Sequence, residues 1–499
     1  MEDKKTDIWD SFSGFLEKEN AIRTALTLFD WDNETLAPEA ASEKTAKAYG
    51  ALSAVYQELL TGEKAGELLE NVKTEKSLSQ RKQALVTKVE KERKKLLSVS
   101  EEEYRRFSEL TAMSVRTWSR AKKQNDFSAF IPVLEKIVEM RKNFACRRAK
   151  DGQRPYDVLL SDYEEDFTIE KLDQFFGELK AGILPLVKER TRKNKVCPIA
   201  CDFLFQNFDV EKQRHFNKWL AAYLGFQFSR GVLSESEHPF TTSFHKDDVR
   251  ITTHYYKNNL ESAVFSTIHE AGHGIFEQGN EDWITQTLLA GGTCGVHESQ
   301  SRFYENMIGR NRAFWEPIYG KLQKNFPEQL EDISLDVFIR AINRSEPGLI
   351  RTEADELTYC LHIIIRYELE KRLISGEVAV SELEEEWKSL YGEYLGVVPK
   401  TAGEGVLQDI HWALGEFGYF PSYALGNAMA AQIYHQMNQQ MDVEELLRKG
   451  DIDQITGYLR EKIHRFGASK GVEEILLEMT GEKLNPKYYV EYLKEKYGE

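Results

Sequence analysis

Two histidines and a glutamate stand close together in STIHEAGHGIF, residues 266–276. His269 and His273 are four positions apart, so on a helix they lie one turn apart on one face, offset by about 40°. Two imidazoles placed in this way can bind one tetrahedral Zn²⁺. Glu270 is turned far enough to miss the metal and still hold a water beside it. The segment predicts a catalytic zinc site, and the alternative is a helix whose histidines form hydrogen bonds within the core.

A catalytic zinc takes three protein ligands and keeps one position open, so a third ligand should follow the helix. The segment GGTCGVHESQSRFYEN, residues 291–306, contains two candidates. Glu298 lies 25 residues after His273, and His297 is its neighbour and rival. We prefer Glu298 because adjacent side chains diverge, and because a carboxylate ligand leaves His297 available for substrate or for a contact behind the metal. The predicted metal ligands are therefore His269, His273 and Glu298.

The elements that must position these residues can be predicted from periodicity. Residues 258–279, NNLESAVFSTIHEAGHGIFEQG, have the apolar spacing of a helix that stops at Gly279. Gly272 and Gly274 each cost this helix about 1 kcal/mol relative to alanine, so we expect another element or a ligand to approach its backbone. Residues 238–256, HPFTTSFHKDDVRITTHYY, are rich in Thr, Val, Ile, Phe and Tyr around a polar turn. They predict a β-hairpin immediately before the helix.

Composition limits the remaining possibilities. The 499 residues are 41% hydrophobic and 30% charged, most segments have helical spacing, and no linker or repeat interrupts them. We therefore expect one mainly α-helical domain over residues 1–499. The formal net charge of −16 argues against nucleic acid or an anionic membrane as the main partner. Five cysteines, no apolar span and a polar first segment predict a cytoplasmic protein.

Several further short motifs occur in order along the chain. They are HPF (238–240), DVRIT (248–252), HEAGH (269–273), HESQSR (297–302), IRTEAD (350–355) and GVLQDIHW (405–412). This series closely resembles the carboxypeptidase Taq family of metallocarboxypeptidases. WDNETLAP and PYDVLLSDYEEDFT also look like family segments, although DYEED stands where a Pro-Gly turn is more common. The resemblance implies a mainly helical zinc-peptidase fold with a deep groove, a small hairpin or sheet beside the zinc helix, and a homodimer.

The resemblance also implies an activity, the removal of single residues from peptide C-termini with catalytic zinc, or cobalt in its place. The metal would activate a water and polarise the scissile carbonyl, and Glu270 would act as general base and then protonate the leaving amine. His411 in GVLQDIHW and Tyr423 in GYFPSYALGN are favoured near the site as donors to the oxyanion. Without the resemblance, a tyrosine in an aromatic-rich stretch is more typical of packing.

A carboxypeptidase must also recognise a free α-carboxylate, and a bidentate guanidinium does this best. Arg351 in IRTEAD is our first candidate, although a structural salt bridge with the acids that follow it is the alternative. Arg250 in DVRIT is the second, because zinc peptidases commonly run substrate alongside a strand. His238 in HPF is expected to shape the pocket.

Two other functions remain open at this point. An oligopeptidase or aminopeptidase would use the same metal ligands, but it would not need Arg351. A catalytically silent peptide-binding protein would not need Glu270, so the presence of this glutamate argues against it.

Overall fold

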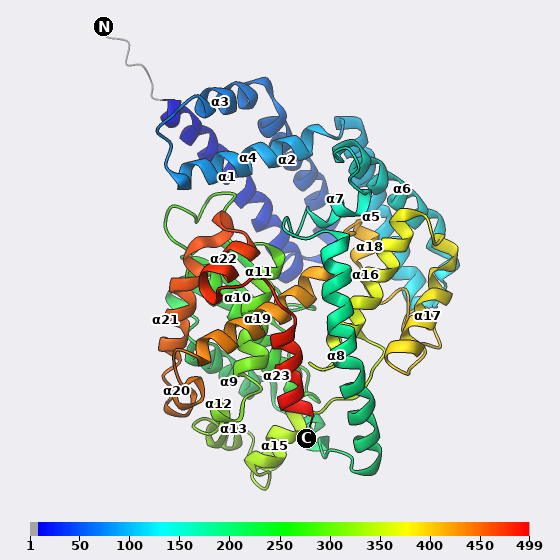
Figure 1. Ribbon diagram of the computed structural model, residues 1–499, viewed down its shortest axis with the longest axis vertical. Helices are drawn as coiled ribbons and strands as arrows, with labels where there is room; N and C mark the ends of the chain where they lie inside the picture. Colours follow the sequence, from blue (N-terminus) through cyan, green and yellow to red (C-terminus); the bar gives the residue numbers. More distant parts are fainter. Residues whose placement is uncertain (1–7, 499) are drawn as a thin grey trace. The chain divides into compact units, whose positions relative to one another are not determined.

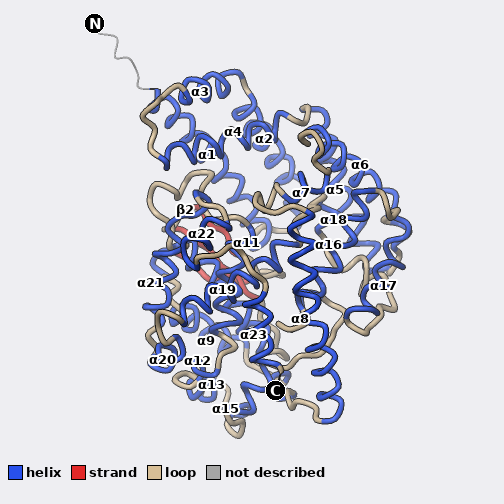
Figure 2. The backbone as a smooth tube through the Cα atoms, in the orientation of Figure 1, coloured by secondary structure: helices blue, strands red, loops and turns tan. Residues whose placement is uncertain are grey.

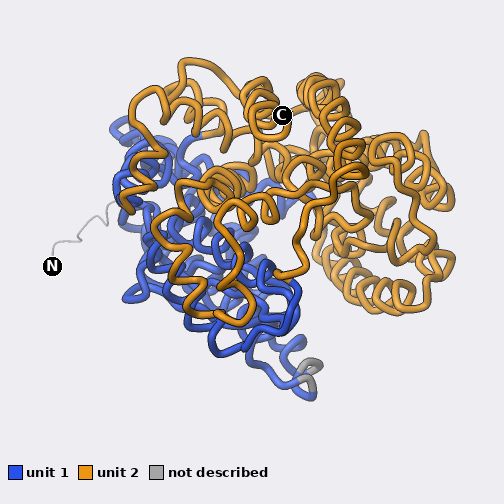
Figure 3. The backbone as a smooth tube through the Cα atoms, turned by 90° about the horizontal axis from the view of Figure 1, so that it is seen from below, with its two compact units in different colours: residues 1–98, 205–292, 451–470 blue, residues 99–204, 293–450, 471–499 orange. Residues whose placement is uncertain are grey.

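The computed structural model describes residues 8–498, which are mainly helical and include one small sheet (Figures 1 and 2). The chain forms two compact units, each built from three separated stretches (Figure 3). Unit 1 takes the chain up to residue 98, then 205–292 and 451–470, and unit 2 takes 99–204, 293–450 and the chain from 471. The predicted fold class, mainly α with a small sheet beside one helix, is confirmed. Among residues 8–498, no helix has both the length and the apolar character that a membrane span requires.

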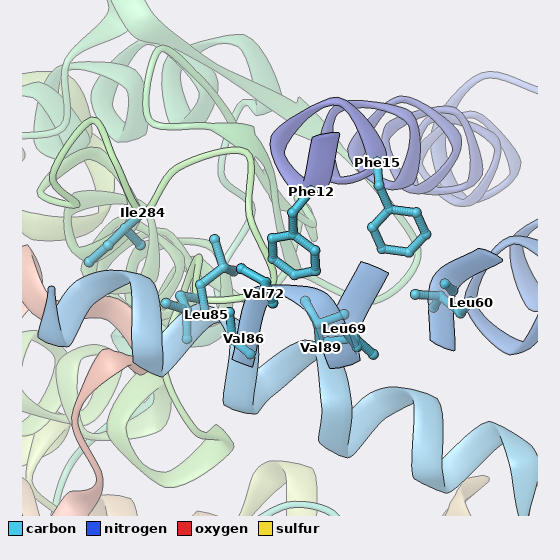
Figure 4. Close-up of a cluster of buried hydrophobic side chains, with 11 residues drawn as sticks. Phe12, Phe15, Leu60, Leu69, Val72, Leu85, Val86, Val89 and Ile284 are labelled. Carbon is cyan, nitrogen blue, oxygen red and sulfur yellow. The ribbon is translucent and has the colours of Figure 1, made fainter. Parts of the chain in front are cut away.

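Unit 1 begins with four helices that enclose an apolar cluster (Figure 4). They are α1 (Ile8–Thr35), α2 (Ser42–Thr61), α3 (Glu63–Lys73) and α4 (Gln80–Leu97). Each helix repeats apolar residues three or four apart, so these side chains share one face and are buried together. The buried members are Phe12, Phe15, Leu60, Ala65, Leu69, Val72, Leu85, Val86, Val89, Ile284 and Leu289.

The remaining elements of unit 1 hold its sheet. They are α9 (Val210–Tyr223), β1 (Gly231–Glu235), β2 (Thr241–His245), β3 (Asp248–Thr253), α10 (Leu260–Gln278) and α21 (Ile452–Lys462). The antiparallel pair β2–β3 is the predicted hairpin. β1 was not expected, and it pairs in parallel with β3, so that β3 is the central strand.

The helix that carries HEAGH is α10, and it packs against β2 and β3. It begins where the Asn259 side chain accepts a hydrogen bond from the Ser262 N–H, and it ends at the predicted Gly279. A Cβ atom at Gly274 would lie 2.7 Å from the Phe226 ring and 3.0 Å from Ile251 of β3. The predicted close approach to the helix backbone is therefore confirmed at Gly274, where the neighbours are the sheet and an aromatic ring.

Unit 2 is almost entirely helical in its described part. Its helices are α5 (Glu101–Gln124), α6 (Ile131–Arg148), α7 (Pro155–Leu160), α8 (Ile169–Val196), α11 (Cys294–Arg302), α12 (Arg312–Trp315), α13 (Tyr319–Asn325), α14 (Pro327–Leu330), α15 (Leu335–Ile342), α16 (Tyr359–Ser375), α17 (Leu383–Tyr394), α18 (His411–Leu414), α19 (Pro421–Asn438), α20 (Val443–Lys449), α22 (Val472–Thr480) and α23 (Lys487–Tyr497).

Short 3₁₀ and π-helical turns join some of these elements. The 3₁₀ turns are Glu39–Ala41, Phe127–Ala129, Asp202–Phe205, Phe228–Arg230, Arg351–Glu353, Val380–Glu382 and His464–Ser469. One π-helical turn, Phe303–Ile308, continues directly from α11.

Two nearly fully buried helices, α16 and α19, form the centre of unit 2. Their apolar residues surround the helix on all sides, as expected for helices with neighbours on every face. α11 packs closely against α19. A Cβ atom at Gly426 of α19 would stand 2.6 Å from Cγ of Glu298, so the glycine is what allows α11 to lie this near. The backbone of unit 2 thereby places Glu298.

Candidate metal centre

Three side chains that could hold a metal ion are brought together in the structure: His269, His273 and Glu298. Each offers one ligand atom, and these atoms all lie within 4.8 Å of one another. The two imidazole rings are 4.9 Å apart between centroids. Two imidazoles and one carboxylate suit a tetrahedral divalent metal whose fourth position is open. The sequence predicted these three residues as the metal ligands, and the rival His297 does not belong to the group.

Glu270 follows the first histidine of this group and is only 6% exposed. Its carboxylate accepts a hydrogen bond from the Thr241 hydroxyl, with 2.6 Å between Oγ1 and Oε2. Thr241 begins β2, on which α10 packs. Strand β2 of unit 1 therefore contacts Glu270, the residue that the sequence predicts to be the general base.

Glu298 is buried and is held by its own helix. Arg302, one turn later on α11, donates from Nε to Oε1 at 2.6 Å, and the Ser301 hydroxyl donates to Oε2 at 3.0 Å. Burial alone would lower the pKa of Arg302, but Glu298 and Glu305 raise it well above its ordinary value. The guanidinium therefore stays charged and orients the carboxylate.

Arg302 connects this ligand to Arg351 through one aromatic ring. The Arg302 guanidinium lies 4.3 Å from the centroid of the Tyr359 ring. Nη1 of Arg351 donates to the Tyr359 hydroxyl at 3.2 Å. The predicted metal ligand Glu298 and the predicted carboxylate anchor Arg351 are thus connected within unit 2 through two intervening residues, Arg302 and Tyr359.

Arg351 is 7% exposed and is paired with Asp409. Its Nε and Nη2 both lie 2.9 Å from Oδ1 of Asp409. The second oxygen accepts from Nε of the fully buried Arg366 at 2.7 Å. Burial would raise the pKa of Asp409, but the charges of Arg351 and Arg366 lower it well below its ordinary value. The expected alternative, a salt bridge with the acids after Arg351, is replaced by a pairing with Asp409.

His411 and Tyr423 lie beside each other and beside this arginine pair. Nε2 of His411 is 3.3 Å from the Tyr423 hydroxyl, and the Arg351 guanidinium lies 5.0 Å from the Tyr423 ring centroid. Burial first, and then the charge of Arg351, lower the pKa of His411 to about 3. Burial raises the pKa of Tyr423. A neutral imidazole and a protonated phenol therefore face the same region, and both can donate hydrogen bonds.

The other two predicted residues lie in the hairpin region of unit 1. Arg250 forms a bidentate pair with Asp248, at 2.9 Å for both contacts, and lies 4.4 Å from the Phe244 ring centroid. Its neighbour Ile251 faces α10, so Arg250 points to the opposite side of the sheet. His238 is exposed, and its carbonyl accepts a hydrogen bond from the Ser236 hydroxyl at 2.6 Å.

Sequence reasoning missed three residues of this region: Thr241, Arg302 and Asp409. Arg302 had a usable signal, because it follows Glu298 by four positions on a predicted helix. Asp409 lies within GVLQDIHW, but nothing local shows that it pairs with arginines 43 and 58 positions away. The position of Thr241 depends on strand register and helix packing, which a single sequence does not display.

Comparisons with known proteins show the family of the chain. The family model described as carboxypeptidase Taq (M32) metallopeptidase matches residues 11–497. The chain is 42% identical to carboxypeptidase 1 of Bacillus subtilis over 97% of each chain. It is 36% identical to thermostable carboxypeptidase 1 of Pyrococcus furiosus over 96% of each. The crystal structure of an M32 carboxypeptidase from Deinococcus radiodurans superposes with a TM-score of 0.95, at 33% identity, over 98% of this chain and 99% of that one.

The close approach at Gly426 makes metal affinity sensitive to one methyl group. In Gly426→Ala the new Cβ would meet Cβ and Cγ of Glu298 at 2.8 and 2.6 Å and displace the carboxylate. We expect zinc affinity, measured by chelator competition, to fall roughly tenfold or more. Gly177→Ala on α8 is the matched control, since no heavy atom lies within 4 Å of its new Cβ. Unchanged affinity in Gly426→Ala would contradict this role of the glycine.

The low pKa of His411 predicts a pH-dependent stability difference. The unfolded chain protonates this histidine near its ordinary pKa of 6.5, whereas the folded protein does so only near 3. Between these values the unfolded state binds the extra proton, so acid destabilises the wild type relative to His411→Gln. The difference in unfolding free energy between the wild type and His411→Gln should change by about 1.4 kcal/mol per pH unit between these two pKa values. Urea unfolding at pH 7.5, 6 and 5 measures it, and a pH-independent difference would refute the neutral buried imidazole.

Proposed function

The chain belongs to the carboxypeptidase Taq (M32) family of metallopeptidases, and on that premise we propose that it is a zinc-dependent carboxypeptidase. It would hydrolyse the last peptide bond of peptides and release single amino acids. The observation that carries the proposal is the group of His269, His273 and Glu298 beside the buried Glu270. Cobalt could take the place of zinc, because the same donor set suits both ions.

Glu270 is the proposed general base. A bound divalent metal would supply Lewis-acid chemistry, polarising the scissile carbonyl and making water more acidic. His269, His273 and Glu298 would hold that ion, with Arg302 fixing the carboxylate ligand from behind. Glu270 would take a proton from the attacking water and return it to the leaving amine.

His411 and Tyr423 are the proposed donors to the oxyanion. Charge that develops on the carbonyl oxygen needs hydrogen-bond donors that are already in position. The Tyr423 hydroxyl keeps its proton because burial raises its pKa, and the adjacent imidazole is neutral. Burial therefore keeps both groups in the form that donates, without adding a positive charge to a region that already contains Arg351.

Arg351 is the proposed contact for the α-carboxylate of the substrate. Hydrogen bonds to Asp409 and Tyr359 use two of its five N–H donors, and Nη2 lies 2.9 Å from Oδ1 of Asp409 in the same ion pair. One carboxylate, Asp409, faces two guanidinium groups, so the cluster retains positive charge that a substrate anion can balance. Asp409 thus positions Arg351 and leaves part of it available.

The hairpin of unit 1 contributes two further residues to the proposed site. Arg250 and His238 are proposed to line the substrate path, with Arg250 second to Arg351 because Asp248 already pairs with its guanidinium.

Family membership supports a homodimer, which light scattering of the purified protein would detect or refute as a doubled mass. All five cysteines are free thiols, which supports the proposed cytoplasmic location, and fractionation of the source cells tests it.

The activity predicts a product ladder that depends on Glu270. The zinc-loaded protein, incubated with an unblocked peptide of about ten residues, should shorten the peptide from its C-terminus. Glu270→Gln should lower the rate by roughly 100-fold or more, because the base is lost, while zinc affinity stays within a factor of about two. Mass spectrometry over time and a chelator control check both statements. Internal fragments or an N-terminal ladder would instead indicate another zinc peptidase, and no cleavage would favour a binding protein.

Loss of Arg351 should remove discrimination between free and blocked C-termini. In Arg351→Gln we expect kcat/KM for a free peptide acid to fall roughly 10–100-fold, because charge-assisted hydrogen bonds to the carboxylate are lost. The peptide amide should be turned over poorly by the wild type and the variant alike. Arg340→Gln, an exposed arginine on α15, is the matched control. If the substitution lowers kcat/KM for the peptide acid and the peptide amide by the same factor, Arg351 is structural and does not bind the substrate carboxylate.

A further inference from the structure

The hydroxyl of Thr241 lies against the carboxylate of Glu270. Oγ1 is 2.6 Å from Oε2 of Glu270 and 3.2 Å from the main-chain oxygen of the same residue. A hydroxyl has one proton, and the shorter contact goes to the charged acceptor, which is also the stronger one. The bond therefore acts on the carboxylate and not only on the helix backbone.

Strand register directs Thr241 to α10. Thr241 pairs directly with Ile251 of β3, so both side chains project from the same face of the sheet. Ile251 contacts α10 at Gly274, four residues after Glu270. A glycine at that place lets the sheet approach until a short side chain such as threonine reaches the glutamate.

The residues before β2 are fixed by Thr252, the last residue of DVRIT. The Phe240 N–H donates to Oγ1 of Thr252 at 2.8 Å, and the Phe240 carbonyl accepts from the Thr252 N–H at 2.9 Å. Thr252 is fully buried, and its Oγ1 also lies 2.6 Å from the Ser236 hydroxyl oxygen. Hydrogen bonds between HPF and DVRIT thus fix the backbone immediately before Thr241. A one-residue shift in the register of β2 against β3 would turn the Thr241 hydroxyl away from α10.

We propose that Thr241 is a positioning residue that orients the Glu270 carboxylate for proton transfer. A hydrogen bond to Oε2 fixes the rotamer and the plane of the Glu270 carboxylate. Oε1 is then the oxygen that transfers the proton. A slightly misplaced base slows the chemical step and lowers kcat, whereas substrate binding is unchanged. This inference rests on the proposed function, in which Glu270 is the base.

The test compares Thr241→Val, which keeps the shape and removes the hydroxyl, with Thr241→Ser, which keeps the hydroxyl. In the zinc-loaded protein we expect kcat of Thr241→Val to fall about tenfold with KM within twofold. Thr241→Ser should stay within about threefold of the wild type. Zinc affinity of all variants, measured by chelator competition, should stay within twofold, because Thr241 contacts the base and does not belong to the ligand group.

A second arm repeats Thr241→Val in the Glu270→Gln background, at high enzyme concentration. If the threonine acts through the carboxylate, the double variant should be no slower than Glu270→Gln alone. A further tenfold loss there, or a kcat of Thr241→Val within twofold of the wild type, would overturn the inference. Full activity of Glu270→Gln would instead show that Glu270 is not the general base, which contradicts the proposed function. If Thr241→Val does not fold, Thr241→Ala replaces it with the same expected outcomes.

Discussion

The polar part of unit 2 depends on one carboxylate that neutralises two buried guanidinium groups. Arg366 is fully buried and Arg351 nearly so, and Asp409 bonds to both. Removing a partner from such a group leaves an uncompensated charge, which is far more costly than losing a surface pair. The arrangement therefore has little freedom to change: Arg351 also donates to the Tyr359 hydroxyl, and the ring of Tyr423 lies against the same guanidinium. The proposed recognition of a planar carboxylate would benefit from that rigidity.

The two glutamates of the candidate centre are held in different ways, and the difference fits their proposed tasks. Glu298 is bound by the permanent charge of Arg302 one helical turn away. Glu270 meets a neutral hydroxyl presented by the sheet. A cation beside a ligand keeps the ligand ionised and still, whereas a hydroxyl beside a base orients it without adding a full charge. The π-helical turn that follows α11 begins immediately after Arg302, so regular helix geometry ends where this support ends.

The sequence was informative where a signal repeats over a short range. Apolar spacing and Gly279 predicted α10, the turn residues predicted β2 and β3, and the spacing of HEAGH with the later Glu298 predicted the three residues that come together. It could not predict β1, because this strand lies just ahead of the hairpin and its parallel pairing with β3 has no turn between the two strands to mark it. The pairing of Asp409 had the same difficulty, since charge alone does not say which of many arginines is adjacent. Side-chain register, which places Thr241, appears only once sheet and helix are packed together.

The division of the chain between the two units has a consequence for biosynthesis. The chain passes from one unit to the other five times, and residues 451–470 belong to the unit that starts at the N-terminus. A nascent chain of 450 residues still lacks part of unit 1, and unit 2 is completed only by the final segment. Unit 1 lacks its third stretch until residue 470 has been made, and unit 2 lacks its third stretch for longer, so shorter nascent chains expose apolar surface, the state that chaperones protect. For the same reason no single proteolytic cut can release either unit as an intact piece.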